Sequence, residues 1–394
     1  MQRPKVRFKG FTDDWEQRKL GELVGIYDGV HQTPDYQDSG IMFLSVENIA
    51  TLKSEKYISE EAFERDYKVY PEKGDILMTR IGDVGTTNVV ETAEKVAFYV
   101  SLALLKPNEI DSYFLSNAMK TNAFQKGLRE RTLVTAIPQK INKDEIGKID
   151  IFITNNDEEQ KKIGAYFSNL DHLITFHQRK CEQTKKLKKY MLQKMFPKEG
   201  QTVPEVRFEG FTDAWEKRKF GDLGSVSMCR RIFKEQTATE GDIPFYKIGT
   251  FGGEPDAFIS RALFEEYKEK YQYPEVGDML ISASGTIGRT VEYAGEDAYF
   301  QDSNIVWFKH DDRVDNSFLK CIYSSVKWSG IEGSTIKRLY NDNFLKTEFS
   351  MPNAEEQKKI GEYFQNLDHL ITLHQRKCDE LQNIKKFMLQ NMFI

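Results

Sequence analysis

The chain has 394 residues, of which 39% are hydrophobic, 30% charged and 12% aromatic, a composition typical of a soluble globular protein with two or three domains. No run approaches the ~18 apolar residues of a membrane span, and the N-terminus MQRPKVRFKGF lacks an apolar signal core. We therefore expect a cytoplasmic protein with no membrane partner. The net charge of −5 argues against a basic protein that coats DNA, but it permits a DNA reader whose basic residues are local. The cysteines lack CxxC spacing and are predicted to be reduced thiols: Cys181, Cys229, Cys321 and Cys378.

The first half of the chain reads as a leading segment, a mixed α/β region and a long helix. The leading segment, VRFKGFTDDWEQRKLGEL, begins at Val6. Short apolar runs bounded by Gly, Asp and Pro predict strands, and a longer run at Ser112–Arg129 predicts a helix. A long amphipathic helix follows, with Asn156 or Asp157 as its N-cap. The predicted strands are Ile41–Val46, Asp75–Thr79, Asn88–Val90 and Val96–Leu105.

The second half repeats this order after a linker, Phe196–Val206. Its leading segment, VRFEGFTDAWEKRKFGDL, begins at Val206, and the shared marks YPEKGDIL and YPEVGDML begin at Tyr70 and Tyr273. Internal repetition on this scale predicts a duplicated two-part unit with pseudo-two-fold symmetry. The predicted elements are strands at Pro244–Ile248, Asp278–Ser282, Thr290–Tyr293 and Asn304–Phe308, and a helix at Asn316–Ser325.

The two long helices are the most strongly repeated part of the chain, with 28 of 39 positions identical between residues 158–196 and 355–393. Seam-like residues recur at steps of four and three, which is a heptad pattern. A lone helix would leave such a seam exposed to solvent, so we predict that the two helices pair, and the two-fold repeat makes the pair an antiparallel coiled coil. The seam positions are Ile163, Phe167, Leu170, Ile174, His177, Cys181, Met191 and Met195 in the first copy, and Ile360, Phe364, Leu367, Ile371, His374, Cys378, Leu381, Met388 and Met392 in the second.

The predicted fold class is therefore α+β, with two mixed α/β domains separated by two long helices. The repeated helix blocks give the predicted boundaries: a first domain at residues 1–156, a central helix at 157–197, a second domain at 198–352 and a distal helix at 353–394.

Local basic patches and glycine-rich turns are the candidate sites for nucleic acid. IGDVGTT and SGTIGRT, from Ile81 and Ser284, follow predicted strands and present backbone N–H groups and hydroxyls suited to phosphate. Arg and Lys supply phosphate contacts, and Ser, Thr and Asn suit base edges. The alternatives are ordinary tight turns and solvated faces. The candidates are Arg80, Thr86, Thr87, Asn88, Arg129, Arg131 and Lys140 in the first domain, and Arg230, Ser284, Thr286, Arg289, Asn304, Lys337 and Arg338 in the second.

The sequence patterns that could indicate a catalytic or metal site are weaker. Pro34-Asp35 with Asp66-Tyr67-Lys68, and Pro255-Asp256 with Glu266-Tyr267-Lys268, loosely mimic a Mg²⁺-dependent nuclease, but their separations differ and chance explains them better. The seam His and Cys residues could in principle hold zinc, and the alternative is a polar seam that sets register. The sequence shows neither a methyltransferase nor a helicase motif. A chain of this length without a defensible catalytic centre is more suited to binding and organising.

Together these features resemble the specificity subunit of type I restriction-modification systems. The resemblance covers essentially the whole chain. It is carried by EEQKKI, NLDHLI and HQRK in the blocks that begin at Glu158 and Glu355, by the leading segments at Val6 and Val206, and by GDxL at Gly74 and Gly277.

The resemblance implies a chain that binds DNA without catalysis or a cofactor of its own. Each domain would be a target recognition domain that reads one half of a bipartite double-stranded DNA site, and the helices would set the spacer. Two methyltransferase subunits using S-adenosylmethionine and two motor-nuclease subunits using ATP and Mg²⁺ would complete the complex. The rival hypotheses are a coiled-coil scaffold that does not bind DNA and a stand-alone site-specific nuclease. The partner-docking candidates are the leading-segment aromatics, Phe8, Phe11, Trp15, Phe208, Phe211 and Trp215.

Overall fold

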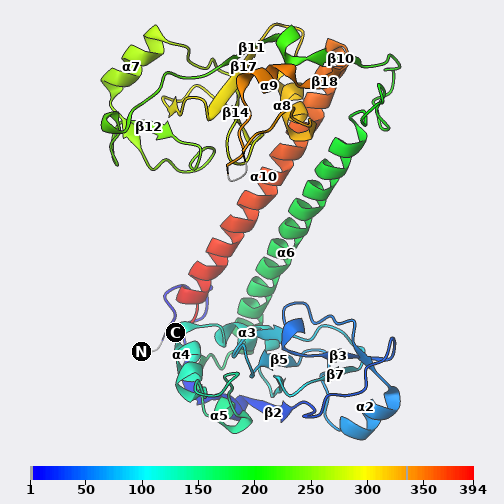
Figure 1. The fold of residues 1–394 in the computed structure, drawn as a ribbon. Coiled ribbons are helices and arrows are strands. Elements are labelled where there is room, and N and C mark those ends of the chain that lie inside the picture. The colour runs from blue at the N-terminus through cyan, green and yellow to red at the C-terminus, as the bar shows by residue number, and fades with distance from the viewer. Residues whose placement is uncertain (1–2, 334–335) are drawn as a thin grey trace. The chain divides into compact units, whose positions relative to one another are not determined.

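The computed structural model describes residues 3–333 and 336–394 (Figure 1). The chain divides into two compact units. Unit 1 comprises the residues up to Gln178 together with Gln375–Ile394, and unit 2 comprises Arg179–His374. The long helices α6 (Asp157–Lys194) and α10 (Ala354–Asn391) each contribute one segment to each unit. Each unit therefore combines an α/β domain with a pair of helix segments.

Unit 1 is built on a four-stranded antiparallel sheet, β2-β8-β5-β6, and a three-stranded mixed sheet, β4-β3-β7. Strand β5 is buried on both faces: Ile76 and Met78 pack with the helices, whereas Leu77 packs with the smaller sheet. Its strands are β1 (Glu16–Lys19), β2 (Val24–Asp28), β3 (Ile41–Leu44), β4 (Tyr57–Ile58), β5 (Ile76–Thr79), β6 (Thr87–Val89), β7 (Val96–Phe98), β8 (Leu102–Pro107) and β9 (Asp150–Ile153). Its short helices are α1 (Leu20–Leu23), α2 (Glu60–Asp66), α3 (Ser112–Ala118), α4 (Asn122–Arg131) and α5 (Lys143–Gly147).

Unit 2 repeats this topology, with sheets β11-β17-β14-β15 and β13-β12-β16. In both units a strand of the leading segment pairs with the strand that precedes a long helix, β1 with β9 and β10 with β18. The strands are β10 (Glu216–Lys219), β11 (Gly224–Ser227), β12 (Ile243–Tyr246), β13 (Phe258–Ile259), β14 (Met279–Ser282), β15 (Thr290–Glu292), β16 (Tyr299–Phe300), β17 (Ile305–His310) and β18 (Glu348–Met351). The helices are α7 (Arg261–Lys270), α8 (Asn316–Ser325) and α9 (Asn341–Lys346). The predicted internal repeat is thus confirmed in the fold.

Two predicted elements are each divided in the structure. The helix predicted at Ser112–Arg129 is two helices, α3 and α4, because the chain turns at residues 119–121 and Thr121 caps the second by accepting from Phe124 N at 3.4 Å. The run Val96–Leu105 is likewise two strands, β7 and β8, which belong to different sheets. Both single-element predictions were wrong because apolar periodicity does not reveal a turn between two buried segments.

The helix segments run antiparallel within each unit, as predicted from the pseudo-two-fold repeat. In unit 1, Phe167 contacts Phe393 with ring centroids 5.7 Å apart, and Asp171 pairs with Lys385. In unit 2, Lys188 pairs with Asp368 at 2.5 Å. Phe196, just after the end of α6, contacts the ring of Phe364. The partner number falls as the α6 number rises, which is the antiparallel direction.

The repeated EEQ motif anchors each leading segment and each α/β domain to a long helix. In unit 1 the buried carboxylate of Glu159 accepts from Arg7 Nε and Nη2 at 2.5 and 2.8 Å. The Gln160 amide accepts from Asp111 N at 2.9 Å, and Asn156 caps the helix by accepting from Glu159 N at 3.1 Å. Unit 2 has the same bonds, with Arg207, Glu356, Gln357, Asp315 and Asn353 in the equivalent places. The motif is therefore a structural joint.

Candidate nucleic-acid interface

In unit 1 the glycine-rich loop between β5 and β6 lies beside the loop that follows α4. Gly82 N donates to Gln139 O at 2.9 Å, and Ile141 N donates to Arg80 O at 3.0 Å. We call these two loops, residues 79–87 and 131–141, the unit 1 loop pair. The pair brings together candidates from two distant segments, namely Arg80, Thr86, Thr87, Arg131 and Lys140.

Two of the predicted contact residues in unit 1 are buried inside the loop pair. The Arg80 guanidinium pairs with the Asp28 carboxylate and donates to Ile141 O at 3.2 Å, and burial lowers the pKa of this guanidinium. The Thr87 hydroxyl lies 3.0 Å from Ser116 Oγ in the core. In this structure Arg80 and Thr87 therefore hold the loops in position and do not face solvent.

The other unit 1 candidates reach the surface. Thr86, Arg129 and Lys140 are exposed, and Arg131 and Asn88 are half-buried. The Asn88 amide donates to Ile49 O at 2.9 Å and to Ala50 O at 3.3 Å, so its NH₂ group is already used within the domain. The exposed residues offer two cations and one hydroxyl, and half-buried Arg131 adds a third cation, which suits phosphate contacts.

Unit 2 has an equivalent loop pair, residues 282–290 and 331–339, of which Ser334 and Thr335 lie outside the described residues. Gly285 N donates to Lys337 O at 2.9 Å, and Leu339 N donates to Ala283 O at 2.8 Å. Ser284 is buried beneath the pair. The remaining loop candidates are exposed, namely Thr286, Arg289, Lys337 and Arg338.

The last two candidates flank the unit 2 loop pair differently. The Asn304 carbonyl accepts from Ala283 N at 2.8 Å, so Asn304 adjoins the pair, whereas Arg230 lies over the Tyr271 ring at 5.3 Å. A cavity of about 540 Å³ opens beside the pair, lined by residues that include Ser303, Arg338 and Tyr340. Its mixed polar lining could receive a sugar, phosphate or base edge.

The leading-segment aromatics separate into two groups. Trp15 and Trp215 are buried in the cores, where Trp15 contacts the Phe114 ring at 5.5 Å between centroids and Trp215 contacts the Phe318 ring at 5.8 Å. The tryptophans are therefore packing residues in this structure. The four phenylalanines are half-buried beside the first turns of the long helices: Phe8, Phe11, Phe208 and Phe211.

Exposed apolar side chains also follow the long helices, on positions outside the predicted seam. Apart from Leu187, they recur at equivalent places in the two copies, and we call them the helix patches. Unit 1 has Leu173, Phe176 and Phe387, and unit 2 has Leu370, Leu373, Leu187 and Tyr190. These residues were not among the predicted contacts, although apolar residues that repeat outside a heptad seam are a signal that could have identified them.

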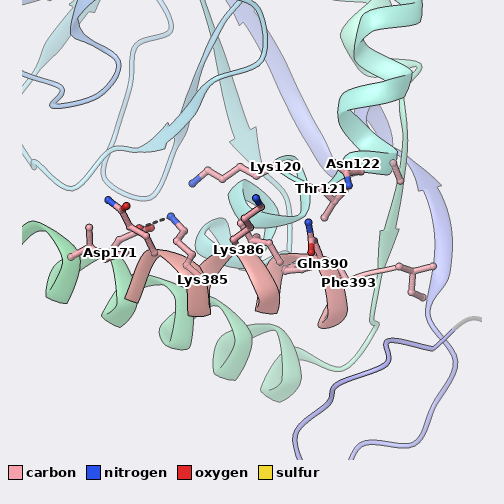
Figure 2. Close-up of a pocket in the computed structure, with 13 residues that line it drawn as sticks. Lys120, Thr121, Asn122, Asp171, Lys385, Lys386, Gln390 and Phe393 are labelled. Carbon is pink, nitrogen blue, oxygen red and sulfur yellow. Dashed lines mark hydrogen bonds and ion pairs between the residues drawn. The ribbon is translucent and has the colours of Figure 1, made fainter. Parts of the chain in front are cut away.

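A cavity of about 700 Å³ lies in unit 1 where the turn before α4 meets the end of α10 (Figure 2). Lys120, Lys385 and Lys386 line it, and Asp171 pairs with Lys385. Burial, and then the charge of Lys385, lower the pKa of Lys120 to about 8. Three ammonium groups against one carboxylate make this lining net positive, so the cavity suits an anionic group.

The part of the chain that the structure describes contains neither a membrane-spanning helix nor a metal-binding cluster. No helix there has the length and apolar character needed to cross a bilayer. No three His, Cys, Asp or Glu side chains within residues 3–333 and 336–394 form a group able to hold a metal ion.

Comparisons with known proteins point to one family. A model of the type I restriction modification DNA specificity domain matches twice, over residues 12–186 and 212–383. A provisionally named type I restriction enzyme specificity subunit of Haemophilus influenzae is 57% identical over 158 residues, which are 39% of this chain and 41% of that protein. The type I restriction enzyme MjaVIII specificity subunit of Methanocaldococcus jannaschii is 22% identical over 95% of this chain and 91% of its own length. The crystal structure of a type I restriction-modification S subunit from M. genitalium shares the fold, with a TM-score of 0.68 at 15% identity over 100% of this chain and 99% of that one.

Proposed function

Because the chain belongs to the type I restriction-modification DNA specificity family, we propose that each of its α/β domains reads one half of a two-part sequence in double-stranded DNA. Family membership implies DNA sequence recognition in a complex with methyltransferase and restriction subunits, without catalysis by this chain. The proposed recognition domains are residues 1–156 and 198–352, and the proposed spacer helices are residues 157–197 and 353–394. Because its target is DNA in the cell interior, we propose a cytoplasmic location.

The observation that carries this proposal is a repeated frame that supports two different loop pairs. Both units use the same strand order, the same EEQ joint and the same pairing of a glycine-rich loop with a basic loop. The loop sequences differ, RIGDVGTT against ASGTIGRT and TLVTAIPQK against IEGSTIKRL. A constant frame with variable loops suits two readers of different half-sites.

We divide the candidates by their exposure and by their position relative to the loop pairs. Thr86, Arg129, Arg131 and Lys140 are the proposed DNA contacts of unit 1, and Thr286, Arg289, Lys337 and Arg338 are those of unit 2. Arg80, Thr87 and Ser284 are proposed to position the loops, because they are buried. Asn88, Arg230 and Asn304 are proposed to lie at the margins.

The long helices are proposed to set the spacing between the half-sites. Each has 38 residues and is therefore ~57 Å long at ~1.5 Å per residue, more than the ~34 Å turn of B-DNA. A paired and buried seam makes such helices stiff enough to act as a ruler.

The duplicated surfaces are proposed to dock two methyltransferase subunits. Each unit offers one helix patch and one pair of leading-segment phenylalanines, so two identical partners would find two equivalent sites. Exposed apolar clusters of this kind mark interaction surfaces. The methyltransferase subunits would bring S-adenosylmethionine, and two restriction subunits would bring ATP and Mg²⁺.

The test is to co-express the chain with its methyltransferase subunit and map N6-methyladenine by single-molecule sequencing. We expect one two-part motif with a fixed gap. Exchanging residues 1–156 for those of another specificity subunit should change one half of the motif only, and lengthening both helices by one turn should change only the gap. A stable complex that methylates no motif would overturn the recognition proposal, and the absence of any complex would favour the scaffold hypothesis.

A further inference from the structure

Three large apolar side chains project from the unit 1 loop pair. Leu133 is 45% exposed, Val134 69% and Ile137 100%. Covering such side chains would remove apolar surface from water, and the folding of this unit leaves that gain unused. A cluster of three within five residues is an exposed apolar patch of the kind that marks an interaction site. We call residues 133–137 the apolar tip.

Backbone hydrogen bonds hold the apolar tip in place. Leu133 N donates to Lys140 O at 2.8 Å and closes the loop, and Ala136 N donates to Leu133 O at 3.3 Å. The Gln139 amide then joins the loop to Gly82 O at 3.0 Å. These bonds fix the ends of the loop that carries the tip, which reduces the conformational entropy lost on binding.

The charge around the apolar tip identifies its partner as nucleic acid. Arg129 and Arg131 precede it in the chain and Lys140 follows it, whereas the nearby exposed acidic residues are Glu130 and, on the paired loop, Asp83. Cations beside an apolar projection match a DNA groove, where phosphates form the rims and base surfaces form the floor. Unit 2 has a similar combination, because the exposed Ile331 and Ile336 lie in the same loop as Lys337 and Arg338.

We propose that the apolar tip enters a DNA groove and that Ile137 is a specificity-determining contact to a base. The proposal rests on the DNA recognition proposed above and names the residue that performs it. Two contacts share this chemistry: packing on a thymine methyl group, or wedging between adjacent base pairs.

The experiment uses the chain in complex with its methyltransferase subunit, the target duplex found by methylation mapping, and a duplex with one half-site scrambled. Ile137→Ser should weaken binding to the target about 5- to 150-fold, the range for one base contact. Its affinity for the scrambled duplex, and the dependence of binding on salt concentration, should stay unchanged. The control Lys140→Ala should weaken binding to both duplexes and lower the slope of log affinity against log salt concentration by about one. The control Val276→Ser removes a 74% exposed apolar side chain from another turn and should change the affinity for neither duplex.

Two further arms identify the contact. Replacing a thymine by uracil should weaken the wild-type complex but not the Ile137→Ser complex if the methyl group is contacted. An increase in 2-aminopurine fluorescence that requires Ile137 would identify the wedge. An unchanged ratio of target to scrambled affinity, or loss of the methyltransferase subunit from the variant, would overturn the role of Ile137. A wild-type complex that discriminates no duplex would instead overturn the proposed function.

Discussion

The buried ion pair between Glu159 and Arg7 allows a direct test of what joins the leading segment to α6. The Glu159 side chain is 0% exposed and that of Arg7 is 12% exposed, and two hydrogen bonds connect them. These hydrogen bonds raise the pKa of the Arg7 guanidinium further above its ordinary value. Glu159→Gln keeps the shape of the side chain and removes its charge, so it leaves a guanidinium almost buried without its counter-ion.

The expected cost is about 3 kcal/mol of unfolding free energy. Removing one member of a buried pair costs about 3–5 kcal/mol. The lower end applies here, because Arg7 Nη1 keeps its bond to Asp13 O at 2.6 Å and the glutamine amide oxygen still accepts one hydrogen bond. For a unit of this size the loss corresponds to a fall of about 6–12 °C in melting temperature.

Urea unfolding followed by fluorine NMR of fluorotryptophan measures the two units separately. Trp15 is the tryptophan of unit 1, and the other three belong to unit 2. Glu159→Gln should lower the midpoint of the Trp15 transition, and the matched variant Glu356→Gln should lower that of Trp215. If the unfolding free energy from the Trp15 transition in Glu159→Gln stays within about 1 kcal/mol of wild type, the reasoning is refuted.

Three further predictions concern packing, pH and docking. Gly164→Ala would place a methyl group 2.2 Å from Asp111 Oδ1, so we expect a loss of about 1–3 kcal/mol in urea unfolding although alanine favours helices, and a stabilised variant would contradict this. Lys120→Met should stabilise the protein by about 1–3 kcal/mol at pH 7, because the lowered pKa means that the folded state holds this proton less tightly than the unfolded chain. The unfolding free energy of the wild type should accordingly rise between about pH 8 and the unfolded lysine pKa of about 10.4, and above that pH the gain from Lys120→Met should vanish. Lys386→Met, at an exposed lysine, is the control. A stability gain that does not depend on pH would refute this cause. Phe387→Ser should weaken binding of the methyltransferase subunit at least several-fold in surface plasmon resonance with an unchanged melting temperature, and unchanged binding would remove the unit 1 helix patch from the docking surface.

Much of the frame could be predicted because its signals are local or repeated. The heptad steps from Ile163 to Ile174 predicted a paired helix, and those residues are buried where unit 1 packs α6 against α10. Strands such as β5 and β14 were recognisable because short apolar runs follow Gly-Asp turns. The turn inside Ser112–Arg129 was missed, because two adjacent helices on one core have the same apolar period as one longer helix.

The candidate site was harder to predict, because exposure depends on distant parts of the chain. Arg80 has the residue type of a DNA contact, but Asp28, 52 residues away, pairs with it below the surface. Ile137 has the residue type of a core position, yet it is fully exposed. Residue type alone does not decide which side chains a loop presents to solvent.

The sequence by itself determined the duplication, the two helices and the family, because identity between the halves and heptad spacing are properties of the linear chain. Only the tertiary structure decided how the repeated EEQ motif is used, since Glu159 bonds an arginine 152 residues away. The structure likewise decided which candidates line each loop pair, because residues near 80 and 140 become neighbours only through backbone hydrogen bonds. Contacts at such separations depend on the packing of a whole domain, and a local pattern does not encode them.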